Sequence, residues 1–398
     1  MSQGLSRRVQ AIKPSPTLVI TAKAAQLRRQ GRDIISLGAG EPDFDTPEHI
    51  KAAAIRAIEA GQTRYTPVDG IPELKEAIQD KFQRDNQLSF EADNILVSCG
   101  GKQSLYNLFQ ALLNPGDEVI IPAPYWVSYP DMVKLAEAEP VIIHAGIKQA
   151  FKVTAGQIEA AISERTRLLI LNSPANPTGA VYTSRELRAI AEVLTRHPNV
   201  LIATDDMYEH IILGDIPFTN LLNVAPELKE RTIVFNGVSK AYAMTGWRIG
   251  YAAGPKEIIS AMRKIQSQST SNPNSIAQWA AVAALTGPQD CIKVMVSAFK
   301  TRNDYVTEAI NRMPGMRTLA AKGAFYSFID ISTAMADKGF ATDTDFVAAL
   351  LEEAEVAAVP GSAFGAPGHM RISFATALET LQKAMARIEC FLRGDHHA

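Results

Sequence analysis

Lys240 is the residue whose surroundings most clearly suggest chemistry. It lies in GVSKAYAMTGWRIGY (residues 237–251), where its neighbours are small or apolar, no acidic side chain occurs, and the next positive charge is Arg248. A lysine in a closed apolar environment has a lowered pKa, so its amine can attack a carbonyl and form a Schiff base. An ordinary lysine whose methylene chain crosses apolar neighbours to reach water fits the same segment.

Other polar groups follow short apolar runs, as the lysine does. They occur in SCGGKQS (residues 98–104), SPANPTG (173–179) and TDDMYEH (204–210). Two glycines before a helix offer free backbone N–H groups to an anion such as phosphate, although they also suit a tight turn. Asn176 and Asp205 belong to residue types that favour turns and helix caps, so each alone has a structural explanation. Four such groups at one sheet edge favour a binding site.

The apolar runs themselves predict the strands of one sheet. Amphipathic stretches alternate with them, which is the pattern of a mostly parallel α/β sheet buried on both faces. In such sheets ligands bind beyond the carboxyl ends of the strands, so we expect the polar groups to meet there. The predicted strands span residues 94–99, 117–122, 140–145, 167–172, 200–205, 232–236 and 248–254.

The two ends of the chain differ from this middle region. Residues 1–49 are rich in loops, whereas residues 291–398 mix helical patterns such as DFVAALLEEA with strand-like stretches such as AFYSFID. We expect these two ends to form a small α+β domain together. Residues 50–290 would then form the large α/β domain, against which the small one packs.

Composition limits the classes of partner. The 398 residues include 40 basic and 42 acidic side chains and 46% hydrophobic residues, and no blocks of charge occur. This balance argues against nucleic acid or an acidic membrane surface and favours a small ligand. Three widely separated cysteines fit a reducing compartment, and the first residues contain no long apolar stretch. A cytoplasmic location is therefore expected.

Three other functional patterns are incomplete or absent. GVSKA resembles the nucleophile elbow of α/β-hydrolases, with Ser239 as nucleophile and His369 as a possible base, but Ala241 stands where the last glycine belongs. The GGKQ segment is not a Walker loop, because Leu96 and Gln103 replace its required glycine and hydroxyl residue. No HExxH pattern occurs, and we expect no metal.

The remaining groups form a set that matches one cofactor. They are an anion cradle, an asparagine, an aspartate, a tyrosine, a lysine and an arginine. Pyridoxal 5′-phosphate (PLP) requires a lysine for its aldehyde, a carboxylate for its ring nitrogen, donors for its phenolate oxygen and positive groups for its phosphate. PLP is therefore the expected cofactor.

The same segments resemble a known family. SPANPTG, TDDMYEH and SKAYAMTGWRIGY, together with LGAGEPDFDTPEHI, RYTPVDGIPELKEAI, GAFYSF and VPGSAFG, are similar to the aspartate aminotransferase superfamily across essentially the whole chain. The resemblance is strongest to the bacterial subgroup with GGKQ and PYWVSYP segments, some members of which also use prephenate. It implies the PLP-dependent aminotransferase fold, with a seven-stranded, mostly parallel sheet flanked by helices, a small α+β domain, and a homodimer with shared active sites.

The resemblance also implies a role for each matching residue toward the cofactor. Lys240 would form the internal aldimine, Asp205 would pair with the pyridine nitrogen, and Asn176 and Tyr208 would hold the 3′-oxygen. Trp126 would stack on the ring. The phosphate would be surrounded by Gly101, Lys102, Ser239 and Arg248, and by Tyr65 from the partner subunit.

On the substrate side, the family pattern assigns the α-carboxylate to Arg371, aided by Asn176, Trp126 and the backbone of Gly40. Lys102 is also the candidate for a distal carboxylate, with Ser15 or Thr17 closing over it, which competes with its role toward phosphate. Many relatives have Ser or Thr where this chain has Gly237, so one hydroxyl contact to the phosphate is expected to be missing.

The reaction implied by this resemblance is L-aspartate plus 2-oxoglutarate to oxaloacetate plus L-glutamate, in two half-reactions. Lys240 would move the proton as general base and then acid. A prephenate or aromatic amino acid aminotransferase is the alternative within this chemistry. A PLP-dependent lyase is a further alternative that the motifs leave open.

Overall fold

Seven strands form the central sheet of the computed structural model, which describes residues 4–14 and 16–394. Their spatial order is β2-β8-β7-β6-β5-β3-β4, and each matches one of the predicted apolar runs, so the predicted sheet is confirmed. The strands are β2 (Ile95–Ser98), β3 (Glu118–Ala123), β4 (Glu139–His144), β5 (Thr166–Asn172), β6 (Leu201–Asp205), β7 (Thr232–Gly237) and β8 (Gly250–Ala253).

Strand direction explains why groups from distant segments share one edge. β3 to β7 pair in parallel, whereas β8 runs antiparallel to both of its neighbours, β2 and β7. β2 therefore points the same way as β7. One edge of the sheet therefore collects the residues that follow β2, β5, β6 and β7. The residues that precede β8, among them Arg248, lie at the same edge.

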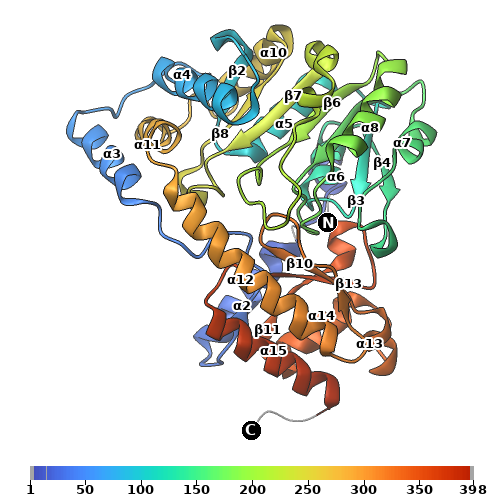
Figure 1. Cartoon of the computed structure of the whole chain (residues 1–398). Coiled ribbons are helices and arrows are strands. Elements are labelled where there is room, and N and C mark those ends of the chain that lie inside the picture. The colour runs from blue at the N-terminus through green and yellow to red at the C-terminus, as the bar shows by residue number, and fades with distance from the viewer. Residues whose placement is uncertain (1–3, 15, 395–398) are drawn as a thin grey trace.

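Helices cover both faces of this sheet (Figure 1). In β5, Leu169 and Leu171 join the apolar cluster beneath α3, α4, α8 and α11, while Leu168 and Ile170 join the cluster beneath α5, α6 and α10. Truncating one such buried leucine to alanine costs about 2–5 kcal/mol. The helices are α3 (Glu48–Glu59), α4 (Pro72–Lys81), α5 (Gly101–Leu112), α6 (Ser128–Leu135), α7 (Ala155–Ala161), α8 (Ser184–Arg196), α9 (Leu221–Val224), α10 (Lys256–Ser267) and α11 (Ser275–Thr286).

The two chain ends come together beside the central sheet. β1 (Ile35–Ser36) pairs in parallel with β11 (Val356–Ala357), and Ile35 and Leu37 share an apolar cluster with side chains between residues 295 and 391. This agrees with the expected association of the ends, while the domain boundaries at residues 49/50 and 290/291 stay a prediction. The other elements are β9 (Arg317–Thr318), β10 (Tyr326–Asp330), β12 (Val359–Pro360), β13 (His369–Ser373), α2 (Pro16–Arg29), α12 (Asp290–Arg312), α13 (Ser332–Asp337), α14 (Asp343–Glu353) and α15 (Leu378–Arg393).

β10 and β13 place two side chains next to the edge of the large sheet. They are antiparallel neighbours in a four-stranded sheet of order β12-β13-β10-β9, and Tyr326 and Arg371 lie on them. α12 runs from the upper to the lower part of the molecule in Figure 1. Within the described ranges, no helix combines the length and the apolar character needed to span a membrane.

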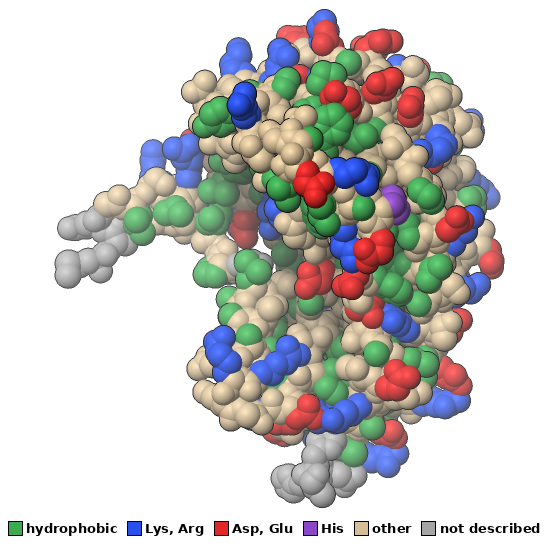
Figure 2. Space-filling model, turned by 90° about the vertical axis from the view of Figure 1, so that its left-hand side faces the viewer, with side chains coloured by type: hydrophobic (Ala, Val, Ile, Leu, Met, Phe, Trp, Pro, Cys, Tyr) green, Lys and Arg blue, Asp and Glu red, His purple; other side chains and the backbone are tan. Residues whose placement is uncertain are grey.

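The N-terminal segment around α1 belongs to none of the three sheets. α1 (Arg7–Gln10) has no buried residue, and Leu5 and Val9 are exposed. Figure 2 shows this segment projecting from the body of the molecule, with apolar side chains on it. Exposed apolar side chains on a projecting segment favour contact with another protein surface.

Candidate active site

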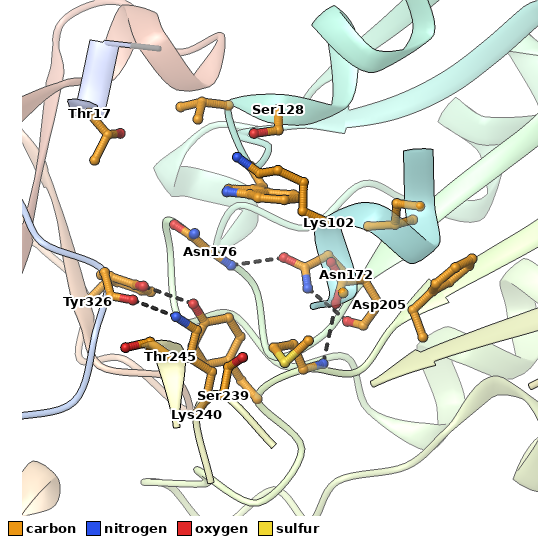
Figure 3. Close-up of a pocket in the computed structure, with 18 of the residues that line it drawn as sticks. Thr17, Lys102, Ser128, Asn172, Asn176, Asp205, Ser239, Lys240, Thr245 and Tyr326 are labelled. Carbon is orange, nitrogen blue, oxygen red and sulfur yellow. Dashed lines mark hydrogen bonds between the residues drawn. The ribbon is translucent and has the colours of Figure 1, made fainter. Parts of the chain in front are cut away.

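A cavity of about 390 Å³ lies at the carboxyl edge of the large sheet. This is where the sequence predicted a ligand site, because ligands bind beyond the carboxyl ends of parallel strands. Its sheet wall consists of Gly101, Asn176, Asp205, Tyr208, Ser239, Lys240 and Arg248, and its β10–β13 wall consists of Gly40, Tyr326 and Arg371. Thr17, Lys102 and Trp126 also line it. The structure thus brings together most of the predicted site residues, and Figure 3 shows Asn176, Asp205, Ser239 and Lys240 around one space.

Glycines allow the first turn of α5 to lie directly against the sheet edge. A Cβ on Gly250 of β8 would clash with the backbone of Gly100 and Gly101, and Gly100 itself has φ +88°. The first amides of a helix have no partner within the helix, so this turn offers donors to an anion. Arg248 lies beside it, donating from Nη2 to the carbonyl of Cys99 at 3.4 Å. This corner can therefore hold a phosphate.

Asp205 is a buried carboxylate at the end of β6. Tyr129 Oη donates to its Oδ2 at 2.5 Å, and the N–H of Met207 donates to its Oδ1 at 3.3 Å. Burial raises the pKa of Asp205, and these two hydrogen bonds and the charge of Lys240 oppose that rise. No described residue forms a salt bridge with Asp205. A turn rather than a helix follows it, so the helix-cap explanation is wrong.

The amine of Lys240 stays inside the cavity. Its Nζ donates to the carbonyl of Gly40 at 2.5 Å and lies 5.9 Å from the centre of the Tyr208 ring. Burial lowers the pKa of Lys240 to about 8, with the Glu41 charge acting against this effect. An amine with that pKa is partly unprotonated at neutral pH and can act as a nucleophile or base. The alternative of a lysine that reaches out to water does not hold.

Arg371 is a buried cation without a charged partner. Only 2% of it is exposed; Nη1 donates to Asn176 Oδ1 at 3.0 Å and Nη2 donates to the carbonyl of Gly38 at 2.6 Å. Its Nε has no hydrogen-bond partner, and no described carboxylate forms a salt bridge with it. Burial lowers its pKa. A buried guanidinium in this state suits a carboxylate, which it can bind with two parallel hydrogen bonds.

Lys102 lies on the far side of the cavity from Lys240. Its Nζ is 5.0 Å from the centre of the Trp126 ring. Figure 3 shows it on the side of Thr17 and Ser128, with Ser239 and Lys240 opposite. Burial first, and the charge of Arg248 second, lower the pKa of Lys102. From this position Lys102 is better placed to bind a second anionic group of a ligand than to bind the phosphate.

Two predicted residues are not part of this cavity. Tyr65 is 92% exposed and lies outside it, so its role toward the cofactor of a partner subunit stays a prediction. Ser15 lies outside the described residues.

Gly237 pairs with Gly250 across β7 and β8, and a Cβ there would lie 3.2 Å from Met207 Cε. A serine or threonine at position 237 would therefore press on Met207 and also on the backbone of Ile249 and Gly250, which lies 3.0 Å from the same Cβ.

The alternative hydrolase pattern fails on geometry. Ser239 lines the cavity, whereas His369 stacks on Phe328 at 5.0 Å and is not among the lining residues.

Asn176 does not cap the next helix, because Thr183 caps α8. The backbone N–H of Asn176 instead donates to Asn172 Oδ1 at 2.9 Å, which holds the SPANPTG turn against β5.

Sequence reasoning assigned no role to several residues that shape the site. The most important are Tyr129 and Tyr326, both almost fully buried. Each lies in a segment that the resemblance included, PYWVSYP and GAFYSF. Tyr129 lies in the first turn of α6, after β3, and Tyr326 lies in β10. Only their contacts across the fold identify them. The other unassigned lining residues are Leu18, Leu105, Val127, Ser128, Asn172, Met207, Phe235 and Thr245.

Within the described part of the chain, potential metal ligands form one cluster. It consists of Asp85, Glu209 and His210, none of which lines the cavity. Lys81 forms an ion pair with Glu209 and lies 4.0 Å from Asp85, and Arg84 pairs with Asp85 at 2.7 Å. The ammonium group of Lys81 already takes the position that a metal cation would need, so these residues form a salt-bridge network.

Comparisons with known proteins agree with this geometry. Residues 32–388 match the family model of class I and II aminotransferases. The chain is 58% identical to an aspartate/prephenate aminotransferase of Nitrosomonas europaea (98% of this chain, 99% of the relative), and 51% identical to an aspartate aminotransferase of Geobacillus stearothermophilus (98% and 99%).

Solved structures show the same fold. The crystal structure of an aspartate aminotransferase from Rhizobium meliloti has a TM-score of 0.94 at 50% identity, covering 98% of each chain. An aspartate aminotransferase from Thermus thermophilus with maleate has a TM-score of 0.92 at 46% identity, covering 97% of this chain and 99% of the other. These values apply to nearly complete chains.

Proposed function

The chain belongs to the class I and II aminotransferase family, and from this membership we propose that it is a PLP-dependent aspartate aminotransferase. It would convert L-aspartate and 2-oxoglutarate into oxaloacetate and L-glutamate. One observation carries the proposal: the amine of Lys240, the carboxylate of Asp205 and the guanidinium of Arg371 line a single cavity without an ion pair among them. Each group is left available to a ligand.

PLP fits the sheet wall group by group. Asp205, buried and without a cationic partner, suits the protonated ring nitrogen, and Lys240 suits the aldehyde. The first turn of α5, Ser239 and Arg248 suit the phosphate, with Gly101 giving the backbone close access. Asn176 and Tyr208 would donate to the 3′-oxygen, and Trp126 would stack on the ring.

The protein side chains then divide the work between binding and proton transfer. When bound, PLP supplies an electron sink for the bonds at the substrate Cα. Arg371 holds the α-carboxylate, because its guanidinium is bound only by an amide oxygen and a backbone carbonyl and keeps its charge available. Lys240 takes the Cα proton and returns it, since a pKa of about 8 suits a group that must do both.

A second carboxylate would bind on the Lys102 side, with Thr17 beside it. Aspartate has such a group, and so does prephenate. The Nitrosomonas relative named above is an aspartate/prephenate aminotransferase, so prephenate is the second candidate amino acceptor. Aromatic amino acids lack this carboxylate, and they would lose the contact with Lys102.

We also propose a homodimer with shared active sites. Ile55, Ile58 and Tyr65 are large apolar side chains that are exposed in the single chain. Tyr65 would reach the PLP phosphate of the partner subunit. Sedimentation analysis should give a dimer. Tyr65→Ala should weaken PLP binding, while Lys240 should still form its covalent linkage with PLP. The three free cysteines favour a cytoplasmic enzyme.

The test of the proposed function is spectroscopic. Purified protein with PLP should absorb in the visible, L-aspartate should convert this band to a near-ultraviolet one, and 2-oxoglutarate should restore it. Lys240→Ala should abolish the covalent linkage, whereas Lys148→Ala, an exposed lysine outside the cavity, should change neither band. A protein that stays colourless with added PLP would refute the proposal.

A further inference from the structure

Tyr326 lies where the two walls of the cavity meet. It is the first residue of β10, it is fully buried, and it lines the cavity. Its hydroxyl contacts the sheet wall, while its ring contacts Arg371. We propose that Tyr326 is a positioning residue that couples Tyr208 to Arg371, an inference that rests on the proposed function.

The hydroxyl of Tyr326 reaches across to the sheet wall. Tyr208 Oη and Tyr326 Oη lie 2.8 Å apart. Burial raises the pKa of both tyrosines, so each keeps one proton to donate at neutral pH. Once Tyr208 donates its proton to the 3′-oxygen of PLP, only Tyr326 can donate within the pair. A hydroxyl that accepts a hydrogen bond is a stronger donor, so Tyr326 strengthens the contact that Tyr208 makes.

The backbone at Gly40 holds this hydroxyl in place. A Cβ at Gly40 would lie 2.9 Å from Tyr326 Oη, which is closer than side chains pack. The carbonyl of the same residue accepts the hydrogen bond from Lys240 Nζ. A larger residue at position 40 would therefore displace either the Tyr326 hydroxyl or the carbonyl that holds the amine. One glycine thus keeps both Tyr326 and Lys240 in position.

The ring of Tyr326 supports the substrate-binding arginine. The guanidinium carbon of Arg371 lies 4.4 Å from the centre of the Tyr326 ring and 5.0 Å from that of Phe364. Aromatic faces attract a cation without neutralising it. A carboxylate in this place would stabilise the arginine equally well, but it would compete with the substrate. The two rings therefore hold Arg371 and leave its charge available.

The charged groups that face the tyrosine pair come from four segments. Arg371 lies on β13, Asp205 ends β6, Lys240 follows β7, and Glu41 follows Gly40. Tyr326→Phe leaves every one of these groups in place and keeps the ring. A change in titration caused by this substitution therefore reports on the hydroxyl alone.

The experiment is a pH titration of the visible absorbance of the PLP-loaded protein. In Tyr326→Phe the midpoint should rise by roughly half to one pH unit, because the deprotonated form loses the support that Tyr208 received. Its KM for L-aspartate should change by less than about twofold, since the ring remains. Tyr326→Leu should show the same shift and, in addition, a KM raised roughly fivefold.

A matched control separates this role from simple loss of packing. Tyr182 is also buried, and its hydroxyl accepts a hydrogen bond from the N–H of Val153 at 3.0 Å, away from Lys240 and Arg371. Tyr182→Phe should lower thermal stability without moving the midpoint. If Tyr326→Phe leaves the midpoint unchanged while the wild type transaminates, the coupling is refuted and the proposed function stands. A wild type without a visible band refutes both.

Discussion

In the sheet wall, Asp205 and Lys240 lie at or just after the ends of neighbouring strands, whereas Arg371 in the β10–β13 wall is held by groups 195 and 333 positions away. The backbone ladder of the large sheet places the backbone of the first pair. β13 pairs with β10 and β12, and hydrogen bonds to Asn176 of the sheet wall and to Gly38 then hold the guanidinium of Arg371. We therefore expect the sheet wall to control the chemical step and the β10–β13 wall to control substrate affinity.

This difference follows from what each wall must do. The sheet wall has to hold charges at fixed places, and parallel strands whose ends share one edge do so without long side-chain contacts. The β10–β13 wall has to accept and release a substrate. Contacts such as the 3.0 Å hydrogen bond from Arg371 to Asn176 can separate when the two parts of the chain move relative to each other.

Asp205→Ala should have the largest effect on the sheet wall. Loss of the carboxylate removes the partner of the PLP ring nitrogen, so kcat should fall roughly 10³-fold or more while KM changes little. Steady-state kinetics with L-aspartate and 2-oxoglutarate give both values. The neighbouring Asp206 supplies the control, because burial already keeps its pKa well above normal and Asn220 donates to it. Asp206→Asn should therefore retain most of the activity, and an equal loss in both variants would contradict the comparison.

Arg371→Lys should have the next largest effect, and it should fall on affinity. Lysine keeps the charge but loses the fork of donors, at a cost of about 2–3 kcal/mol in substrate binding. The value of kcat/KM should therefore fall roughly 10²-fold, mostly through KM. A loss confined to kcat would contradict the division between the two walls. Maleate, a dicarboxylate without an amino group, provides a direct binding measurement by competition.

Sequence reasoning predicted the sheet wall better than the opposite wall, and the cause is physical. Seven apolar runs identified the strands, and the polar residues at their ends had to meet at one edge. Asp205 and Lys240 could thus be placed from local pattern alone. Arg371, in contrast, came only from resemblance, because its neighbours in HMRISFA carry no pattern that points to the sheet edge.

Tyr326 and Tyr129 show where such reasoning ends. Each is a buried tyrosine in an apolar stretch, which is ordinary core composition. Their roles depend on single hydrogen bonds, to Tyr208 and to Asp205, that join residues 118 and 76 positions apart. Periodicity contains no information about such pairs. A structure is needed to find them.

Lys102→Ala should have a smaller effect, confined to substrates with a second carboxylate. Lys102 forms no salt bridge with a described residue, and a partly exposed ion pair contributes about 1 kcal/mol. The kcat/KM for aspartate should fall roughly fivefold to tenfold, while that for tyrosine should stay within about twofold. Lys148→Ala is the control, an exposed lysine outside the cavity. Unchanged values for both substrates would remove Lys102 from the distal carboxylate site.

The pH dependence of PLP uptake should show the smallest effect, and it tests whether the two walls interact. Lys240 reacts only as the free amine, and its pKa of about 8 lies below the 10.5 of an exposed lysine. The rate at which PLP-free protein forms the visible-absorbing adduct should rise with pH, with a midpoint at about pH 8, and level off at higher pH. A rate that still rises through pH 10 would refute the lowered pKa.

Two charges on the side of the β10–β13 wall should move the midpoint of this pH dependence in opposite directions. The Glu41 carboxylate raises the pKa of Lys240 and the Arg371 guanidinium lowers it. Glu41→Gln should therefore move the midpoint down, and Arg371→Leu should move it up. Stopped-flow absorbance across the pH range measures both shifts. Two unmoved midpoints would mean that Lys240 depends on burial alone, and the walls would then be electrostatically independent.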